Sequence, residues 1–518
     1  MLLHGGARIM TRSARRARKV HTARDYKQDS RWPGWELVVG IEVHAQIKSR
    51  RKLFSEALAS DLNTPPNTNV VPFDAAFPGT LPRLNPKCVE LGVRTAIALN
   101  AEVQHRSAFD RKHYFYADLP SGYQITQQYA PIARNGRLQL KEDDIIVRIK
   151  QVQLEQDTGK STSLLRNRLT AIDLNRAGMG LMEIVSEPDM RSPEEAGSYV
   201  RALQALLRSV GSSDGNMEQG SLRCDVNVSV NRKACEAFRQ IALLDKGISV
   251  TQETRGFDEE KAETFSLRSK EDAPDYRYMP DPNIPPLLLD KSYIESIRRN
   301  MPELPDATRA RLLERGLSER DVEVLMLVDS GREVGYDGQL GHGAVAYFDE
   351  VSQGRNPKEV VNWITHELLG QLSFRNETFT DNPISAKQMG DLVDLVSSGK
   401  VTGPCRAHLC FSAEILTTSV TMTGTSGKTI LRHILSTRTP DPPSKIAEDL
   451  QLLVISDGGA SLEKWCRDAI AALPEQAEAV RRGNVNVVNK IMGHVMKASR
   501  GTAKAQDVRE MLLKLLRN

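Results

Sequence analysis

A change of hydrophobic periodicity at the proline-rich stretch 279–286 (MPDPNIPP) restricts the possible folds of this chain more than any other property. Before this stretch, apolar and polar residues alternate in runs such as 41–47 and 145–152, and a period of two predicts strands with one buried face. After it, the segments that begin at 301 and 321 are typical of helices. We therefore predict the α+β class, with a strand-rich part followed by helices.

Local signals refine the strand-rich part. The pair Asn135-Gly136 and the tripeptide 120–122 (PSG) predict turns between strands. Residues 192–195 (SPEE) predict the start of one clear helix, because proline suits the first turn and acidic residues favour the positive end of the helix dipole. Apolar residues then recur at helical spacing, at Val200, Leu203, Leu206 and Leu207.

The length of 518 residues exceeds what one hydrophobic core usually supports. We expect a main domain at 35–292, a helical connector domain at 293–372 and a helical tail at 373–518. No apolar run approaches the ~18 residues that would cross a bilayer, so no membrane span is expected. The six cysteines form no CxxC pair, which indicates buried or free thiols and neither a disulfide framework nor a zinc site.

The first 34 residues have a composition of their own. Arginine and hydroxyl-bearing residues recur, and no acidic residue occurs before Asp25. This composition is typical of a mitochondrial transit peptide, and the apolar core of a secretory signal is missing. The alternative is a basic tail that contacts nucleic acid. We expect residues 1–34 to be a transit peptide and exclude them from the fold.

Two fragments contain the GK[ST] triplet of phosphate-binding loops, at 159–161 and 427–429. A P-loop also requires a glycine five positions before the glycine of this triplet. Those positions hold Leu154 and Met422, so any ATP bound by this chain is not held by a P-loop.

Carboxylates recur on the polar faces of the expected strands. Glu42 and His44 point to one side, as do Glu155 and Asp157, because side chains repeat every two residues. Glu183 lies within an apolar run, where a charge is costly unless it is paired or bound to a metal. Together these residues could form a site for a hard cation such as Mg²⁺. The alternatives are solvated strand faces for Glu42 and Asp157 and a buried ion pair for Glu183.

A further cluster, DRKHYFYAD at 110–118, places cations beside aromatic residues. This combination suits contact with phosphate together with stacking on a base or ribose. The alternative is an edge strand with a mixed surface.

Long segments of the chain, in the same order over residues 37–518, resemble the GatB family, one of the subunit families of the glutamyl-tRNA(Gln) and aspartyl-tRNA(Asn) amidotransferases. The segments are GIEVH at 40–44, FDRKHYFYADLPSGYQI at 109–125, LEQDTGKS at 154–161, IDLNRAGMGLMEIVSEPD at 172–189, GNMEQGSLRCDVNVS at 215–229, QETRGFD at 252–258, DYRYMPDPNIPPL at 275–287, MPELPD at 301–306 and IMGHVMKASRGTAKAQDV at 491–508.

The resemblance implies a mixed or antiparallel β cradle that holds ATP and Mg²⁺, an all-α helical domain and a small YqeY-like helical tail that contacts tRNA. It implies a ligase in which ATP phosphorylates the γ-carboxylate of misacylated glutamyl-tRNA(Gln) and ammonia then displaces phosphate. It also implies a separate amidase (glutaminase) subunit that supplies the ammonia, a small third subunit of C or F type, and a role in translation in the mitochondrial matrix.

Carried over residue by residue, the metal ligands of the family fall on His44, Glu155 and Glu183. The implied catalytic residues are Glu42, Lys112 and Asp157, with Glu42 beside the metal and Lys112 at a phosphate. The implied residues for nucleotide or acceptor-end binding are Lys112, Asp173, Asn175, Arg176, Arg223 and Asp225.

The chain also departs from the family pattern. A family segment of the form Lys-Asn-Leu/Ile-Asn-Ser is missing after Val230, which indicates either a gene-model error or true divergence that removes part of the cradle wall. Ala117 and Ser121 replace the usual proline and lysine. Two alternative functions follow: an inactive tRNA-binding scaffold, or an enzyme for aspartyl-tRNA(Asn).

The last segment is strongly basic. Residues 481–518 contain nine basic and two acidic residues, a net charge of +7, whereas the whole chain has a net charge of +4. Apolar spacing in this segment predicts two short amphipathic helices. We expect Lys497, Arg500 and Lys504 to contact the tRNA backbone, against the alternative of a solvated helix surface.

Overall fold

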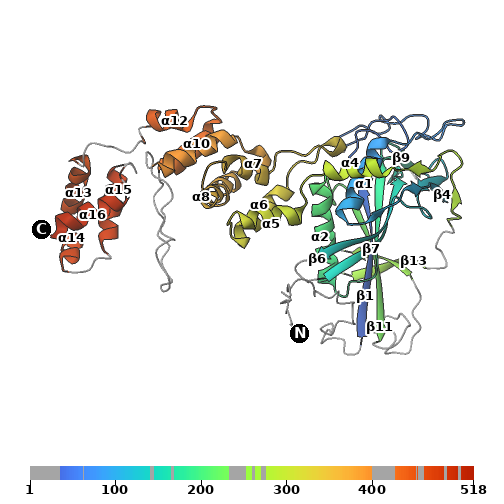
Figure 1. The fold of residues 1–518 in the computed structure, drawn as a ribbon, viewed down its shortest axis with the longest axis horizontal. Coiled ribbons are helices and arrows are strands. Elements are labelled where there is room, and N and C mark those ends of the chain that lie inside the picture. Colours follow the sequence, from blue (N-terminus) through green and yellow to red (C-terminus); the bar gives the residue numbers. More distant parts are fainter. Residues whose placement is uncertain are drawn as a thin grey trace, which may run out of the picture.

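The structure is a computed structural model, and it describes residues 35–61, 63–140, 145–164, 169–232, 253–258, 263–269, 276–398, 426–450, 452, 460–482, 487–499, 503 and 505–517. Three bodies follow one another along an elongated molecule, and each has its own hydrophobic core (Figure 1). The first body contains the strands, and the other two are helical. The predicted α+β class is therefore confirmed.

A six-stranded antiparallel sheet forms the centre of the first body. Alternating side chains give this sheet one apolar face and one polar face, as the period of two predicts. The strands lie in the order β11 (Leu222–Arg232), β1 (Trp35–Gln46), β10 (Gly180–Ser186), β7 (Ile145–Gln156), β6 (Ala133–Leu140) and β2 (Glu102–Val103).

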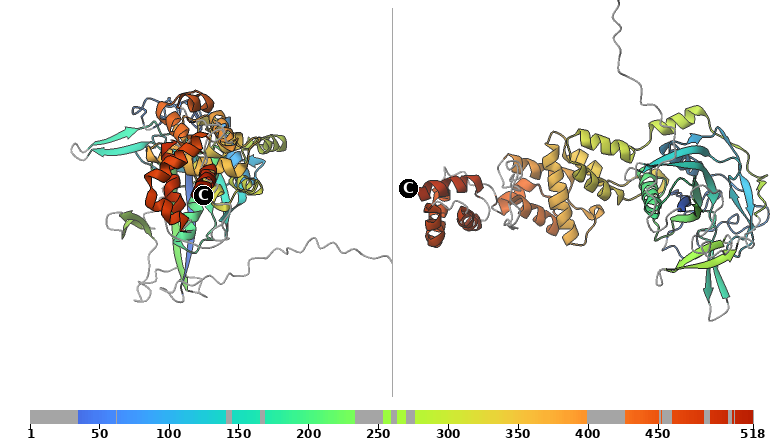
Figure 2. Two further views of the ribbon diagram at one scale, coloured as in Figure 1. Left: turned by 90° about the vertical axis from the view of Figure 1, so that its left-hand side faces the viewer. Right: turned by 90° about the horizontal axis from the view of Figure 1, so that it is seen from below.

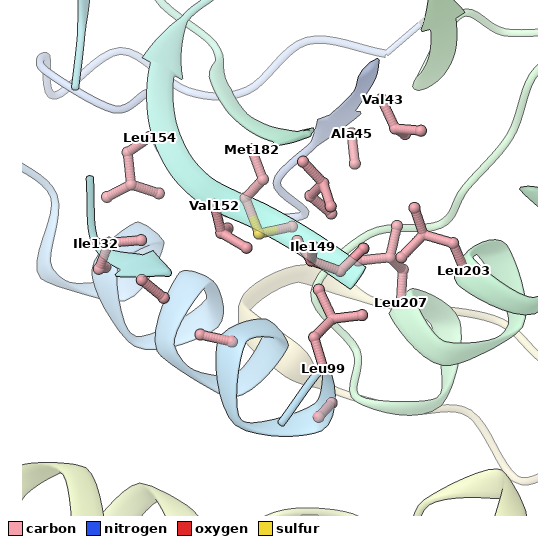
Figure 3. Close-up of a cluster of buried hydrophobic side chains, with 14 of the residues drawn as sticks. Val43, Ala45, Leu99, Ile132, Ile149, Val152, Leu154, Met182, Leu203 and Leu207 are labelled. Carbon is pink, nitrogen blue, oxygen red and sulfur yellow. The ribbon is translucent and has the colours of Figure 1, made fainter. Parts of the chain in front are cut away.

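Two helices, α1 (Pro86–Ala98) and α2 (Pro193–Ser209), cover the apolar face of this sheet. Figure 3 shows Leu203 and Leu207 of α2 beside Ile149 of β7 in the buried cluster. The predicted start of α2 is confirmed, because the Ser192 hydroxyl accepts a hydrogen bond from the amide of Glu195 at 3.1 Å.

The structure corrects the expectation of only one clear helix among the strands. Nine of the 13 residues of α1 are buried, so this helix lacks the wide polar face that gives a recognisable helical period. α1 therefore looks, in sequence, like one more apolar stretch of the strand-rich part.

The structure also corrects one of the two predicted turns. Asn135 has a φ of +56° but lies inside β6, not between strands. A side chain at Gly136 would meet the carbonyl oxygen of Leu99 at 3.2 Å, so the glycine lets the end of α1 approach β6. The turn at 120–122 is confirmed, with the amide of Gly122 donating to the carbonyl of Leu119 at 3.0 Å.

Smaller antiparallel sheets surround the main one. A three-stranded sheet has the order β14, β4, β5, and it covers part of the polar face through contacts between β5 and β7. The hairpin of β8 and β9 projects from the first body (Figure 2). The bounds are β14 (Met279–Pro280), β4 (Asp110–His113), β5 (Tyr123–Thr126), β15 (Leu287–Leu288), β3 (Arg106–Ser107), β8 (Lys160–Leu164), β9 (Leu169–Asp173), β12 (Glu253–Asp258) and β13 (Glu263–Ser269).

Helices dominate the chain after β15. The segments expected to be helical from 301 and from 321 correspond to α5 and α6. The helices from β15 to the end of the middle body are α4 (Lys291–Arg299), α5 (Pro305–Glu314), α6 (Glu319–Ser330), α7 (Ala344–Val351), α8 (Pro357–Asn362), the π-helical turn η3 (Trp363–Leu368), α9 (Leu369–Phe374), α10 (Ala386–Ser397), α11 (Ser426–Thr437) and α12 (Pro443–Asp449). Two short 3₁₀ turns are η2 (Tyr336–Gly338) and η4 (Phe379–Asp381).

The third body consists of α13 (Ala460–Ala472), α14 (Pro474–Arg481), α15 (Val488–Ala498) and α16 (Ala505–Arg517). The last two helices bury Ile491, Val495, Val508 and Leu512, as the apolar spacing predicted. The middle core joins residues from Leu312 to Leu452, on both sides of the expected boundary at 372. The domain bounds 35–292, 293–372 and 373–518 stay predictions.

Among the described helices, none combines the length and apolar character that a bilayer crossing requires.

Candidate functional site

The polar face of the main sheet carries the candidate site residues. His44 on β1 lies opposite Glu183 on β10, and Glu183 lies opposite Gln153 on β7. Glu155 follows two residues after Gln153 and therefore lies on the same face. Because β10 lies between β1 and β7, three strands that are far apart in sequence bring one histidine and two carboxylates together.

One nitrogen or oxygen atom from each of His44, Glu155 and Glu183 lies within 4.8 Å of the others. The Nε2 atom of His44 is 3.9 Å from Oε1 of Glu155 and 4.0 Å from Oε2 of Glu183. The Glu155 side chain is only 2% exposed, and its Oε2 atom has no hydrogen-bond partner among the described residues. We call these three residues the triad.

The electrostatics of the triad favour a bound cation. Burial, and the neighbouring carboxylate of Glu155, raise the pKa of Glu183 to about 8. One imidazole and two adjacent carboxylates, with a buried oxygen that lacks a partner among the described residues, form a donor set suited to a divalent cation. The residues present therefore fit the Mg²⁺ ion that the family resemblance implies.

Lys112, on β4, reaches the triad from the three-stranded sheet. Its Nζ atom is 3.7 Å from Oε1 of Glu155 and 5.1 Å from the ring centroid of Tyr276. Burial alone would lower the pKa of Lys112, but the carboxylates of Glu155 and Glu183 raise it above its usual value. The ammonium group is therefore charged at neutral pH beside the triad.

Gln153 was missed by the sequence reasoning, although it lies on the same alternating strand face as Glu155. Its buried amide donates hydrogen bonds to Oε2 of Glu183 and, at 3.2 Å, to the hydroxyl of Thr126. Its own oxygen accepts a hydrogen bond from Gln151 at 2.6 Å. These contacts fix the orientation of the Glu183 carboxylate. The period of two was the available signal for this residue.

Asp157 belongs to a second cluster beside the triad. Its carboxylate accepts a hydrogen bond from Arg223 at 3.1 Å, and Nε of Arg176 lies 3.6 Å from its other oxygen. Arg176 also donates to the carbonyl oxygens of Thr158 at 3.0 Å and Gly159 at 2.6 Å. Two guanidinium groups in this position can bind phosphate or carboxylate groups of a ligand.

Glu42 and Asp225 border the triad on the side of β1 and β11. They lie opposite one another, and Oδ2 of Asp225 is 4.0 Å from Nδ1 of His44. The oxygen Oε1 of Glu42 is 3.4 Å from Nδ2 of Asn227. The structure therefore brings both acids next to His44.

Asp173 and Asn175 have a different setting from the other candidates. The carboxylate of Asp173 accepts a hydrogen bond from the amide of Asn67 at 3.0 Å, and the side chain of Asn175 accepts one from the amide of Asn69 at 2.9 Å. Their described contacts hold this loop in place.

A buried ion pair lies near the same loop and was also missed. The side chains of Lys52 and Asp74 are both 0% exposed, and Nζ of Lys52 is 3.0 Å from Oδ2 of Asp74. Burial lowers the pKa of Lys52. The other oxygen of Asp74 has no hydrogen-bond partner within the described part of the chain. Neither residue stands in a periodic pattern, so the sequence offered no signal for this pair.

Asp74 also lines a cavity of about 210 Å³ that reaches the second cluster. Ser121, Gln156 and Asp157 line it as well. Ser121 is the position at which the resemblance implies a lysine. The side chains of Asp74, Ser121, Gln156 and Asp157 make this part of the cavity wall polar.

The basic tail is described in part. Lys497 is exposed in the last turn of α15, and its contact with tRNA stays a prediction. Arg500 and Lys504 lie outside the described residues, as do residues 1–34 of the expected transit peptide.

Comparison with known families shows the family to which this chain belongs. The model of the GatB/GatE catalytic domain matches residues 37–295, and that of the GatB domain matches residues 346–407 and 415–516. The first of these matches contains the triad, Lys112 and the second cluster.

Individual relatives match over most of their length. The mitochondrial glutamyl-tRNA(Gln) amidotransferase GatB subunit of Laccaria bicolor is 52% identical, covering 96% of this chain and 95% of that protein. The protein of the same name from Mycosarcoma maydis is 43% identical, over 94% and 88% of the two chains. The aspartyl/glutamyl-tRNA(Asn/Gln) amidotransferase GatB subunit of Ruegeria pomeroyi is 40% identical, over 93% and 96%.

The alignment with the Laccaria bicolor protein runs over 547 positions, which exceeds the 518 residues of this chain. This chain therefore lacks residues that the relative has. The stretch after Val230, where the resemblance implies a missing segment, continues into residues 233–252, which lie outside the described residues.

Proposed function

Because this chain belongs to the GatB/GatE family, we propose that it acts as the GatB subunit of a mitochondrial glutamyl-tRNA(Gln) amidotransferase. Its activity is that of a carbon–nitrogen ligase that uses ATP and converts glutamyl-tRNA(Gln) to glutaminyl-tRNA(Gln). The relatives from Laccaria bicolor and Mycosarcoma maydis are named as mitochondrial proteins, which supports this compartment.

In the proposed reaction, a carboxylate oxygen of the glutamyl side chain attacks the γ-phosphorus of ATP, and ADP leaves. Ammonia then forms a bond to the activated acyl carbon, the bond from that carbon to the phosphate oxygen breaks, and the nitrogen releases a proton as the amide forms. Neither step requires a covalent bond to the protein. Both depend on the position of the reactants and on neutralisation of phosphate charge.

The residues of the site suit these two requirements, positioning of the reactants and neutralisation of phosphate charge. His44, Glu155 and Glu183 would hold Mg²⁺, and this ion supplies charge neutralisation at the phosphates when it is bound. Lys112 contributes a second positive charge next to Glu155. Gln153 orients Glu183 by a hydrogen bond.

The remaining charged residues of the site surround the triad. Glu42 is the acid that faces the substrate from β1. We assign Arg176 and Arg223, with Asp157 between them, to the nucleotide or to the acceptor end of the tRNA. Asp225 borders this region from β11, and Asp173 and Asn175 support it through the loop that they hold.

The observation that carries the proposal is the meeting of the triad with Lys112. The test uses the assembled complex with ATP labelled at the γ-phosphate, glutamyl-tRNA(Gln) and ammonium chloride as the nitrogen source. We expect release of labelled phosphate that depends on the tRNA and matches the glutaminyl-tRNA formed. Amide formation without phosphate release would overturn the proposal.

The proposed complex contains an amidase subunit that releases ammonia from glutamine and a small third subunit of C or F type. The tail, with Lys497, Arg500 and Lys504, binds the backbone of the tRNA. Residues 1–34 direct the chain to the mitochondrial matrix and are then removed.

A second substrate is suggested by the bacterial relatives, whose names include aspartyl-tRNA(Asn). Parallel assays with aspartyl-tRNA(Asn) and glutamyl-tRNA(Gln) distinguish the two substrates. An inactive scaffold is disfavoured, because a chain that only binds tRNA has no use for two adjacent buried carboxylates and a histidine on one strand face.

A further inference from the structure

Five tyrosine rings form a continuous row at the side of the first body, and we call them the tyrosine row. Neighbouring ring centroids are 5.6–6.2 Å apart, and the interplanar angles of 61–76° are typical of edge-to-face aromatic contacts. In order along the row, the members are Tyr116, Tyr114, Tyr276, Tyr278 and Tyr129.

The three-stranded sheet assembles the tyrosine row from separate parts of the chain. Two of the tyrosines follow β4, one follows β5 and two precede β14. Strand β14 pairs with β4, and the amide of His113 donates to the carbonyl of Tyr276 at 2.8 Å. Backbone pairing thus fixes the middle of the row, whereas Tyr116 and Tyr129, at its two ends, lie in the segments that follow β4 and β5.

The middle of the tyrosine row adjoins the proposed reaction site. The ammonium group of Lys112 lies 5.1 Å from the ring centroid of Tyr276 and 3.7 Å from Glu155 of the triad. A ligand whose reactive group reaches the triad can therefore lie along these rings.

The two ends of the tyrosine row face solvent. Tyr116 is 61% exposed and Tyr129 is 62% exposed. At one end, Arg134 donates to the carbonyl of Tyr129 at 2.6 Å, and the exposed Arg277 stands between Tyr276 and Tyr278 in sequence. Exposed aromatic rings beside cations are the pattern by which proteins bind single-stranded nucleic acid, with bases on the rings and phosphates on the cations.

We propose that the tyrosine row is the docking surface for the unpaired 3′-terminal nucleotides of the aminoacylated tRNA. This inference rests on the proposed function and adds the surface that guides the acceptor end to the triad. The glutamyl group is esterified to the last nucleotide, so that nucleotide must lie close to Lys112 when the side-chain carboxylate meets the triad. The preceding nucleotides then stack on the exposed rings.

The extent of the row favours this occupant over the adenine of ATP. A single base covers one or two rings, whereas the row has five rings and is exposed at both ends. An unpaired strand offers several bases in succession together with a phosphate for each. The positive charge at Arg134, Arg277 and Lys112 complements those phosphates.

The test uses the assembled complex and a tRNA that carries pyrrolo-cytidine, a fluorescent cytidine analogue, at the position before the terminal nucleotide, since stacking quenches the fluorescence of this base. The variants are Tyr116→Ala and Tyr129→Ala. Tyr116→Phe and Tyr129→Phe keep the rings and serve as conservative variants. Phe374→Ala, which removes an 86% exposed ring from α9 in the second body, is the matched control.

We expect the parent, the phenylalanine variants and the Phe374→Ala control to quench the fluorescence equally, and the alanine variants to quench it less. With aminoacylated tRNA, each alanine variant should raise the KM for tRNA about tenfold. The KM for ATP and the kcat should stay close to those of the parent. Because Tyr116 and Tyr129 are exposed, their truncation should leave the fold intact, which circular dichroism checks.

Three outcomes overturn the inference. A higher KM for ATP with an unchanged KM for tRNA assigns the rings to the adenine of ATP. Dissociation of the complex on gel filtration of the alanine variants assigns them to a protein interface. Unchanged quenching assigns them to packing alone. The fluorescence assay requires no turnover, so it remains decisive even if the parent complex fails to phosphorylate glutamyl-tRNA.

Discussion

At the scale of single residues, the properties of the triad depend on the charge state of Glu183. Its carboxylate is largely buried next to Glu155, and burial together with that neighbour raises its pKa to about 8. A bound divalent cation reverses this balance, because it favours the charged form of both carboxylates. The same residue therefore links metal binding, proton release and the stability of the sheet.

We predict that Glu183→Gln abolishes the ATP hydrolysis that depends on tRNA while the fold persists. The amide keeps the shape of the side chain but removes a ligand charge, which costs several kcal/mol of transition-state stabilisation. Phosphate release and thermal unfolding are measured in parallel, with Glu194→Gln on the exposed face of α2 as the control. Normal turnover in Glu183→Gln would reject the ligand role, and a collapsed thermal transition would support a buried ion pair instead.

The pH dependence of metal binding gives a second prediction. In the metal-free fold Glu183 holds its proton up to about pH 8, whereas the unfolded chain releases it near the ordinary value of 4.5. The stability from this group is therefore fully present below pH 4.5 and is lost as the pH rises to about 8. At pH 6 nearly every molecule carries this proton, and Mg²⁺ has to displace it. At pH 8 a large fraction of the molecules has already released the proton, so Mg²⁺ binds with less competition.

The increase in Tm on addition of Mg²⁺ should accordingly be larger at pH 8 than at pH 6. Differential scanning fluorimetry at both pH values measures it, and Glu183→Gln should remove the difference. Equal increases at both pH values in the parent would contradict the prediction.

The pair formed by Lys52 and Asp74 gives a third prediction, on stability. Asp74→Ala leaves a fully buried ammonium group without its partner, which should destabilise the first body by about 3–5 kcal/mol. Urea denaturation followed by circular dichroism measures the loss. The double variant Lys52→Met, Asp74→Leu removes both charges and should recover most of it, which separates the unpaired charge from a general packing defect.

At the scale of elements, the strand faces were predictable and the strand order was not. The period of two placed Glu42 with His44 and Glu155 with Asp157, since it depends only on neighbouring residues. The position of β10 between β1 and β7 results from pairing across long stretches of sequence, so the meeting of Glu183 with His44 required the structure.

Helix α1 and Asn135 show two other reasons why local patterns fail. Helix α1 is buried on most sides, so it has no polar stripe by which a helix is recognised in sequence. Asn135 has a left-handed backbone conformation but still lies within the paired strand β6. Tertiary contacts, with the main sheet in one case and with the end of α1 in the other, outweigh the local signal. The alternation of side chains along the strand could have identified Gln153, whereas no periodic pattern in the sequence indicates Lys52 or Asp74.

The two helices at the end of the chain, α15 and α16, lead to a fourth prediction. Replacing Lys497, Arg500 and Lys504 by alanine should raise the KM for glutamyl-tRNA and flatten the slope of log affinity against log salt by ~0.7–0.9 for each lost phosphate contact. ATP hydrolysis at saturating tRNA should change much less, because the triad lies in another body.

Filter binding at several salt concentrations measures the slope. The matched control replaces the exposed residues Lys358, Lys387 and Lys445 of the second body by alanine. If the tail variant and this control bind tRNA with the affinity and slope of the parent, the tail is not a tRNA-binding element.

At the scale of the whole molecule, three hydrophobic cores lie in a row (Figure 1). The first and second bodies meet through polar contacts: Arg332 donates to the carbonyl of Ser209 at 3.1 Å, and the amide of Asp337 donates to the carbonyl of Lys48 at 2.7 Å. The basic tail proposed to bind tRNA is thus separated from the triad by the entire middle body. A macromolecule as long as tRNA can engage both ends of the chain at once.

The proposed import of the chain gives a fifth prediction, for residues 1–34. Their basic, acid-poor composition indicates removal after import, so the protein purified from mitochondria should start shortly before Trp35. Mass spectrometry of the N-terminal peptide measures this. An intact Met1 in the mitochondrial protein would contradict it.

Strand β1 pairs on one side with β10 and on the other with β11, so both neighbours of this first strand are synthesised long after it. Such pairing gives the first body a high contact order, and loop-closure entropy must be overcome before either partner arrives. His44 and Glu183 lie on opposite sides of one of these late pairings. Metal binding by the triad requires β1, β10 and β7 to be paired, so its recovery during refolding can serve as a kinetic marker of these long-range pairings.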